Sequence, residues 1–212
     1  MATSAPSELG SVRTGAAAPA PAGAHRPSIS ATSARRLPRI PGESTPALAL
    51  GPVGYVTDTD TVVGHVHLKV SDLERSIAFY RDVLGFELQQ RFGDSAAFLG
   101  AGGYHHHVGL NTWMSRGGPP APGGSAGLFH AAFLYPTRGA LARAVVRVVE
   151  ARVPLSGASD HGVSEAVYLS DPDQNGLELY WDRPRAEWPR TPDGGVEMFT
   201  QPLDLPDLVA QA

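Results

Sequence analysis

The sequence predicts an α+β fold in which two tandem βαβββ modules form one curved, mixed β-sheet cleft with the helices outside. Three observations predict it. Short runs rich in β-branched residues alternate with amphipathic helices, and the order strand, helix, strands occurs twice. A Gly/Pro-rich linker at residues 115–127 separates the two occurrences. Aligning the two strand–helix starts makes His65 correspond to His130.

Composition excludes several classes of function. The 212 residues fit one or two domains of about 100–200 residues each. Seventeen Lys and Arg against 21 Asp and Glu give a net charge of −4 without a basic run, which argues against nucleic acid or an anionic membrane as the main partner. Cysteine is absent, so disulfides, thiolate metal sites and cysteine nucleophiles are excluded. No apolar window approaches the about 18 residues of a membrane span, and we expect a cytoplasmic protein.

Residues 1–60 are expected to be a disordered or loosely docked leader. They are rich in Ala, Pro and Ser and cannot bury enough apolar area to offset their ordering entropy. Residues 48–56 are a candidate for a short docked strand. Arg35 and Arg36 suggest a twin-arginine export signal, but prolines and a glutamate follow where that signal needs an apolar core.

The first module is expected at about residues 61–114. "VVGHVHLKV" is rich in β-branched residues and predicts the first strand. "SDLERSIAFYRDVLGF" predicts a helix, with Ser71 and Glu74 as a capping box and Gly85 as a left-handed C-cap. Three further strands are predicted from "FELQQRF", "SAAFLGAG" and "YHHHVGLNTW".

The second module is expected at about residues 128–183. "LFHAAFLYP" predicts its first strand, and Thr137 caps a helix through "RGALARAVVRVVEARV". "AVYLSDP" and "GLELYWDRP" predict a hairpin around residues 173–176. A C-terminal extension, residues 184–212, contains a predicted short packing helix in "PLDLPDLVAQA". The domain as a whole is expected to span residues 61–205.

Two histidines and a glutamate are candidates for metal ligands. Alternation along a strand points His65 and His67 to one face and their neighbours to the other. Glu178 lies within an apolar strand, where an inward-facing carboxylate needs a partner. His65, His130 and Glu178 on facing strands would make a facial triad that suits Fe(II) and leaves coordination positions open. Taken singly, each residue also fits an ordinary sheet surface, so both interpretations stay open.

The segment "GHVHLKVSDLERSIAFYRDVLGFEL" resembles the opening of a module of the vicinal oxygen chelate superfamily. That superfamily contains glyoxalase I, type I extradiol dioxygenases, fosfomycin-resistance thiol transferases and bleomycin-binding proteins. The resemblance covers about residues 61–205. Its opening motif is shared by all branches, so it implies the fold, with a metal site in the cleft, and leaves the reaction open.

The pattern of histidines resembles type I extradiol dioxygenases, and the chain looks closest to catechol 2,3-dioxygenase-like proteins. This resemblance implies extradiol (meta) cleavage of a catechol-type substrate by O2, a reaction of aromatic catabolism. The implied cofactor is Fe(II), with Mn(II) as an alternative. It also implies a homodimer. The large members have four modules where this chain has two. The resemblance assigns metal ligation to His65, His130 and Glu178, proton transfer to His107 in "HHVGL", and substrate contacts to His161 in "DHGVS" and to Tyr168, ten residues before Glu178.

The histidine triplet is divided by strand alternation. His105 and His107 can share a face, which His106 cannot join. We expect His107 in the pocket as a proton carrier, and His106 outside or at the strand edge. The roles of His67, His105 and His106 are not fixed by the resemblance.

Three rival functions share the fold. A glyoxalase-like isomerase usually adds a carboxylate from the first module, yet no Asp or Glu occurs between Asp94 and Glu150. A thiol transferase acting on a phosphonate with Mn(II) would need clustered basic side chains, and Lys69, Arg91 and Arg116 are scattered. A non-catalytic, bleomycin-binding type of protein needs no metal triad, so metal content distinguishes it.

Overall fold

The computed structural model describes residues 57–212. The predicted strand at 48–56, the twin-arginine pair and the predicted leader up to residue 56 lie outside the described residues. No helix among residues 57–212 is long and apolar enough to cross a membrane.

The first module forms a four-stranded sheet. Its strand order is β1-β4-β3-β2, with β1 parallel to β4 and the other pairs antiparallel. The helix α1 continues as a π-helical turn at Phe79–Val83. The elements of this module are β1 (Val66–Lys69), α1 (Leu73–Ala78), β2 (Glu87–Phe92), β3 (Ala96–Gly100) and β4 (Val108–Asn111).

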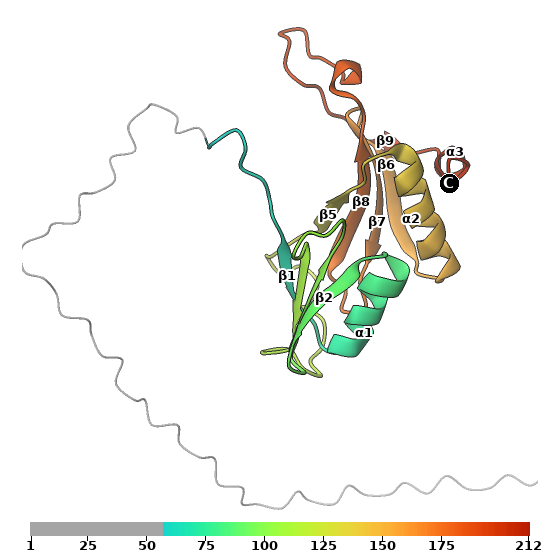
Figure 1. Ribbon diagram of the computed structural model, residues 1–212. Coiled ribbons are helices and arrows are strands. Elements are labelled where there is room, and N and C mark those ends of the chain that lie inside the picture. Colours follow the sequence, from blue (N-terminus) through green and yellow to red (C-terminus); the bar gives the residue numbers. More distant parts are fainter. Residues whose placement is uncertain (1–56) are drawn as a thin grey trace, which may run out of the picture. The chain divides into compact units, whose positions relative to one another are not determined.

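The second module repeats this order and adds a fifth strand. Its sheet runs β5-β8-β7-β6-β9, again with the first strand parallel to its neighbour (Figure 1). The strand β6, with the sequence LSGASD, is not among the strands predicted individually, because it has no β-branched or aromatic residue. The elements are β5 (Ala131–Leu134), α2 (Arg138–Glu150), β6 (Leu155–Asp160), β7 (Ser164–Ser170), β8 (Gly176–Asp182), a 3₁₀ turn (Arg185–Glu187), β9 (Gln201–Pro202) and α3 (Leu205–Val209).

The predicted α+β class with two βαβββ modules is confirmed. The expected curved sheet is built as two sheets, one from each module. Apolar side chains on one face of each sheet pack with the helices into the hydrophobic core, and these include Leu68 and Leu110 from the first sheet and Leu177 and Leu179 from the second. The opposite face of each sheet carries the polar and histidine side chains of interest here.

The helix caps follow the sequence closely, with one correction. Asp72, and not Ser71, caps α1, because the Ser71 hydroxyl donates instead to Asp173 Oδ1 at 2.5 Å. Gly85 ends the helical segment with a φ of +84°, as a left-handed C-cap requires. Thr137 caps α2 by accepting a hydrogen bond from the Ala140 amide at 3.1 Å.

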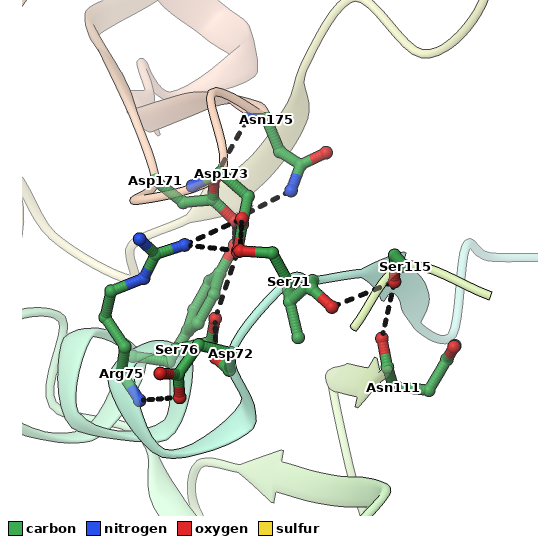
Figure 2. Close-up of polar contacts among 11 residues, drawn as sticks. Ser71, Asp72, Arg75, Ser76, Asn111, Ser115, Asp171, Asp173 and Asn175 are labelled. Atoms are coloured by element: carbon green, nitrogen blue, oxygen red, sulfur yellow. Dashed lines mark hydrogen bonds and ion pairs between the residues drawn. The ribbon is translucent and has the colours of Figure 1, made fainter. Parts of the chain in front are cut away.

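A partly buried polar cluster joins the two modules. Asp171 and Asp173, in the turn between β7 and β8, face the start of α1 (Figure 2). Arg75 pairs with Asp173 at 2.7 Å, and the fully buried Tyr80 donates its hydroxyl proton to Asp171 at 3.0 Å. We call Ser71, Arg75, Tyr80, Asp171 and Asp173 the inter-module cluster. It fixes the first helix against the hairpin that carries Tyr168 and Glu178.

Candidate functional site

Four candidate residues lie on the second module, at one face of its sheet. On β8, Leu177 and Leu179 are buried against the core, so Glu178 between them faces the opposite side. Tyr168 on β7 is the direct register partner of Glu178. His130 immediately precedes β5, whose Ala132 is the register partner of Glu178 on its other side.

These side chains form one continuous chain of polar contacts, an ion-pair contact followed by two hydrogen bonds. His130 Nε2 lies 2.9 Å from Glu178 Oε2. The Tyr168 hydroxyl lies 3.2 Å from Glu178 Oε1 and 2.7 Å from His161 Nε2. The structure therefore brings together His130, Glu178, Tyr168 and His161, in that order.

The environment of Tyr168 keeps its hydroxyl neutral. Burial, followed by the charge and hydrogen bond of Glu178, raises the pKa of Tyr168 to about 12. The phenol therefore retains its proton throughout the neutral range and can act as a hydrogen-bond donor there.

The turn that carries His161 is held by contacts to the carboxylate of Asp160. Arg183 binds both carboxylate oxygens of Asp160, at 2.7 and 3.0 Å, and the Gly162 amide donates to Asp160 at 2.8 Å. Burial alone would raise the pKa of Asp160, but these donors outweigh it and lower the pKa. Gly162 has a φ of +78°, a backbone conformation that side chains other than glycine rarely adopt.

His65 lies on the first module, in a separate group of histidines. Its ring centroid is 4.5 Å from that of His106, which in turn is 5.0 Å from Phe98. His67 lies directly over Gly109, where an added Cβ would come within 2.9 Å of the imidazole. Burial, followed by the neighbouring His65, lowers the pKa of both His67 and His106.

The histidine triplet lies in the loop before β4, and not in the strand predicted from Tyr104, because β4 begins at Val108. Strand alternation therefore does not divide it. His105 and His107 both pack on Tyr104, with ring centroids 4.1 and 4.7 Å away, but His105 Nδ1 also lies 2.7 Å from His106 Nδ1. His106 is half-buried just outside β4, with its ring against His65. Only the three-dimensional packing shows which of the three histidines faces His65.

His107 borders a cavity between the modules. The cavity has a volume of about 750 Å³, and its lining includes Phe86, Ala132, Phe133 and Tyr180. The backbone amide of Ala101 donates to His107 Nδ1 at 3.2 Å. No hydrogen bond within residues 57–212 joins His107 to the chain that begins at His130.

The donor set fits a divalent metal in part. Two donors at right angles on one metal, each bonded at about 2.1 Å, lie about 3.0 Å apart. The 2.9 Å separation of His130 Nε2 and Glu178 Oε2 matches that spacing. Within residues 57–212, however, no three His, Cys, Asp or Glu side chains lie close enough together to hold a metal ion, so the structure does not bring His65 to this pair.

The first module has no counterpart of Glu178. On β1 and β4, His67 pairs with Gly109 just as Ala132 pairs with Glu178 on β5 and β8. The position from which a glyoxalase-like isomerase would take its extra carboxylate is therefore a glycine. A carboxylate there would also collide with the ring of His67.

A second cavity, of about 500 Å³, adjoins the candidate site. His130 and Tyr168 are part of its wall, together with Phe129, Ser170 and Gln174. None of the residues that line it is a lysine or an arginine. It therefore offers an aromatic wall and neutral hydrogen-bonding groups next to the candidate ligand His130.

Sequence reasoning missed the groups that hold His161. The Phe199 carbonyl lies 2.9 Å from His161 Nδ1, and the Thr200 hydroxyl lies 3.3 Å from the same nitrogen. Both residues belong to the C-terminal extension. No motif marks them, and the strand that follows them, β9, is two residues long.

Comparisons with known proteins agree on the fold family. Residues 62–179 match the sequence profile of the Glyoxalase/Bleomycin resistance protein/Dioxygenase superfamily. The chain is 40% identical over 153 residues to a protein named catechol-2,3-dioxygenase from Bacillus subtilis (strain 168), covering 72% of this chain and 53% of that protein. It is 32% identical over 124 residues to biphenyl-2,3-diol 1,2-dioxygenase 3 from Rhodococcus globerulus, covering 57% of this chain and 63% of that protein. The chain thus spans less than two thirds of the length of these relatives.

A solved structure with a similar fold is a glyoxalase/dioxygenase from Nostoc punctiforme. It is 20% identical, with a TM-score of 0.49, and the match covers 62% of this chain and 99% of that one.

Proposed function

Because the chain belongs to the glyoxalase/bleomycin resistance protein/dioxygenase superfamily, we propose that it is an extradiol dioxygenase that opens the ring of a catechol-type substrate with O2. The observation that carries the proposal is the chain of polar contacts through His130, Glu178, Tyr168 and His161 on one sheet face. Its members are the second-module residues to which the resemblance assigns ligand and substrate contacts. The similarity to catechol-2,3-dioxygenase supports the same reaction.

The proposed cofactor is Fe(II), with Mn(II) as the alternative, held by His65, His130 and Glu178. The spacing of His130 and Glu178 and their mixed N,O donor set support these two ligands, whereas His65, which the structure does not bring to the pair, is proposed from the resemblance. The bound metal would supply a Lewis acid that lowers the pKa of the catechol hydroxyls and would provide a binding position for O2 beside the ring.

Tyr168 and His161 are proposed to bind and orient the diol. Their polar atoms lie next to Glu178 and 2.7 Å from each other, so both can reach one substrate oxygen. Such contacts fix the ring relative to the ligands and restrict the reacting geometry. The cavity behind His130 and Tyr168 then takes the ring substituent.

His107 is proposed as the proton carrier for ring opening. It borders the cavity between the modules, and its Nδ1 is already engaged by the Ala101 amide. His106 is a second candidate for this role because its ring packs on His65. Substituting each histidine separately distinguishes the two.

We further propose that the protein is cytoplasmic and forms a homodimer. The lack of cysteine fits a reducing compartment. Large apolar side chains such as Val63 and Phe129, which are 93% and 89% exposed, offer a surface that a second copy would cover.

The test is ring cleavage by the full-length chain after anaerobic loading with Fe(II). The chain is mixed with catechol and substituted catechols in aerated buffer, and the yellow ring-opened product is followed by absorbance. We expect rapid formation of product, and its loss in Tyr168→Phe but not in Tyr104→Phe. The Tyr104 variant keeps the ring that packs on His107 and removes a hydroxyl that makes no hydrogen bond within residues 57–212. An iron-loaded protein that yields no product with any catechol, yet isomerises a hemithioacetal, would replace this proposal with a glyoxalase-like activity.

A further inference from the structure

We propose that the main chain fixes His161 and His107 in opposite tautomers, and that the C-terminal extension does this for His161. In this arrangement His161 Nε2 can accept a proton, while His107 Nε2 donates a hydrogen bond. The tautomers follow from the hydrogen bonds alone, and only their catalytic consequence rests on the proposed function.

The tautomer of His161 is set by Phe199. A carbonyl oxygen can only accept, so the 2.9 Å contact between His161 Nδ1 and the Phe199 carbonyl places a proton on Nδ1. The neutral ring then has its lone pair on Nε2. Tyr168 has a single hydroxyl proton, which it shares between Glu178 Oε1 at 3.2 Å and this lone pair at 2.7 Å. The shorter contact, to His161, takes the larger share of the donation.

The tautomer of His107 is set by Ala101. A backbone N–H can only donate, so the 3.2 Å contact from the Ala101 amide leaves Nδ1 of His107 without a proton. The proton of the neutral ring is then on Nε2. Two histidines of the same proposed site thus differ in which ring nitrogen is protonated.

The two tautomers suit different parts of ring opening. As the substrate O–H bond breaks, its proton forms a new O–H bond to Tyr168, while the original hydroxyl proton of Tyr168 moves to His161 Nε2. The products of this relay are an oxyanion on the substrate and an imidazolium whose Nδ1–H still binds the Phe199 carbonyl. The reverse relay returns this proton to the product. The N–H of His107 Nε2 can donate a hydrogen bond to the developing oxyanion, and transfer of that proton requires His107 to take up a second proton at Nδ1 in place of the Ala101 contact.

The C-terminal extension makes several contacts with the turn at His161 and with the end of β6. Phe199 also donates its own amide to the carbonyl of His161 at 3.3 Å. Its ring covers Gly162 so closely that an added Cβ there would come within 2.7 Å. The next residues, Gln201 and Pro202, form β9 and pair with the end of β6. Phe199 and Thr200 are therefore positioning residues, which act on the substrate only through His161.

The tautomers can be measured directly on the full-length, ¹⁵N-labelled chain without metal. Long-range ¹H–¹⁵N correlation spectra separate protonated from unprotonated ring nitrogens, and His161→Gln and His107→Gln assign the two rings. We expect a proton on Nδ1 of His161 and on Nε2 of His107. The opposite assignment for either ring would overturn the inference for that histidine, whether or not the protein cleaves catechols.

Every variant at residue 199 keeps the backbone carbonyl, so the role of the extension is tested through the Phe199 ring, which packs on Gly162 and holds that carbonyl at His161. Phe199→Ala removes the ring, Phe199→Leu is the conservative variant, and Met198→Ala, at a residue 67% exposed, is the control. We expect Phe199→Ala to displace the carbonyl and give a mixture of His161 tautomers while the His107 signals stay unchanged, and Phe199→Leu to restore the single tautomer. In the Fe(II)-loaded protein, kcat should fall about tenfold or more in Phe199→Ala. An unchanged His161 tautomer in folded Phe199→Ala would refute the positioning role of Phe199.

Discussion

Replacing Tyr80 by phenylalanine tests the inter-module cluster with the loss of one oxygen atom. The Tyr80 side chain is fully buried, and its hydroxyl donates to Asp171 Oδ2 at 3.0 Å. Asp171 is 1% exposed, and Asn175 Nδ2 is the other donor to the same oxygen, at 2.9 Å. Tyr80→Phe therefore removes one of these two hydrogen-bond donors to a buried carboxylate oxygen and leaves the aromatic ring in place.

The size of the effect follows from these contacts. A hydrogen bond to a charged group contributes about 1.5–3 kcal/mol, and since Asn175 partly compensates we expect a loss of about 2 kcal/mol. For a folded unit of the size of residues 57–212, that loss lowers Tm by about 4–8 °C. Urea unfolding followed by circular dichroism measures the free energy, and differential scanning calorimetry measures Tm.

The matched control is Tyr104→Phe. Tyr104 is 40% exposed, and its hydroxyl makes no hydrogen bond to any residue from 57 to 212. We expect this change to remain within about 0.5 kcal/mol of the wild-type stability. If Tyr80→Phe were no more destabilising than Tyr104→Phe, the inter-module cluster would not contribute to stability as described.

Three further outcomes are expected. Burial, followed by the charge of Asp171, raises the pKa of Tyr80 well above its ordinary value, so the folded chain keeps a proton that the unfolded chain loses above about pH 10. Stability should therefore fall as the pH rises through that range, and Tyr80→Phe should reduce the slope measured by urea unfolding. His107→Phe should keep the iron content near the wild-type value and suppress turnover. If only His106→Phe suppressed turnover, His106 and not His107 would be the proton carrier. Because no lysine or arginine lines the cavity beside His130, catechols with uncharged substituents should exceed carboxylated ones in kcat/KM by about tenfold, and equal values would exclude that cavity as the substituent site.

Much of the second module is predictable because its signals are local. Strand alternation around Glu178, the Thr137 cap and the hairpin at residues 173–176 depend on neighbouring residues, and the structure contains all three. The helix cap at Ser71 was predicted one residue early. Its hydroxyl is taken by Asp173, a partner distant in sequence that no local pattern reveals.

The arrangement of the histidines depends on long-range packing and is only partly predictable. The resemblance predicts His130 and His161 as site residues, and the structure contains both in one chain of polar contacts. Which side of the triplet faces His65 depends on how β1 and β4 pair, so the sequence could not distinguish His106 from His107. The Phe199 contact was not predictable either, because it is made by a backbone carbonyl and any residue type supplies one.

The most direct test of the proposed function measures O2 uptake and product formation together in the Fe(II)-loaded chain. An oxygen electrode and the absorbance of the ring-opened product are recorded in one cuvette, with Glu178→Ala and the exposed Glu150→Ala as the paired variants. The account predicts equimolar consumption of O2 and catechol by the wild-type chain and by Glu150→Ala, and loss of both iron and uptake in Glu178→Ala. Full iron retention and unchanged O2 uptake in Glu178→Ala would contradict it, since the reacting centre would then lie elsewhere.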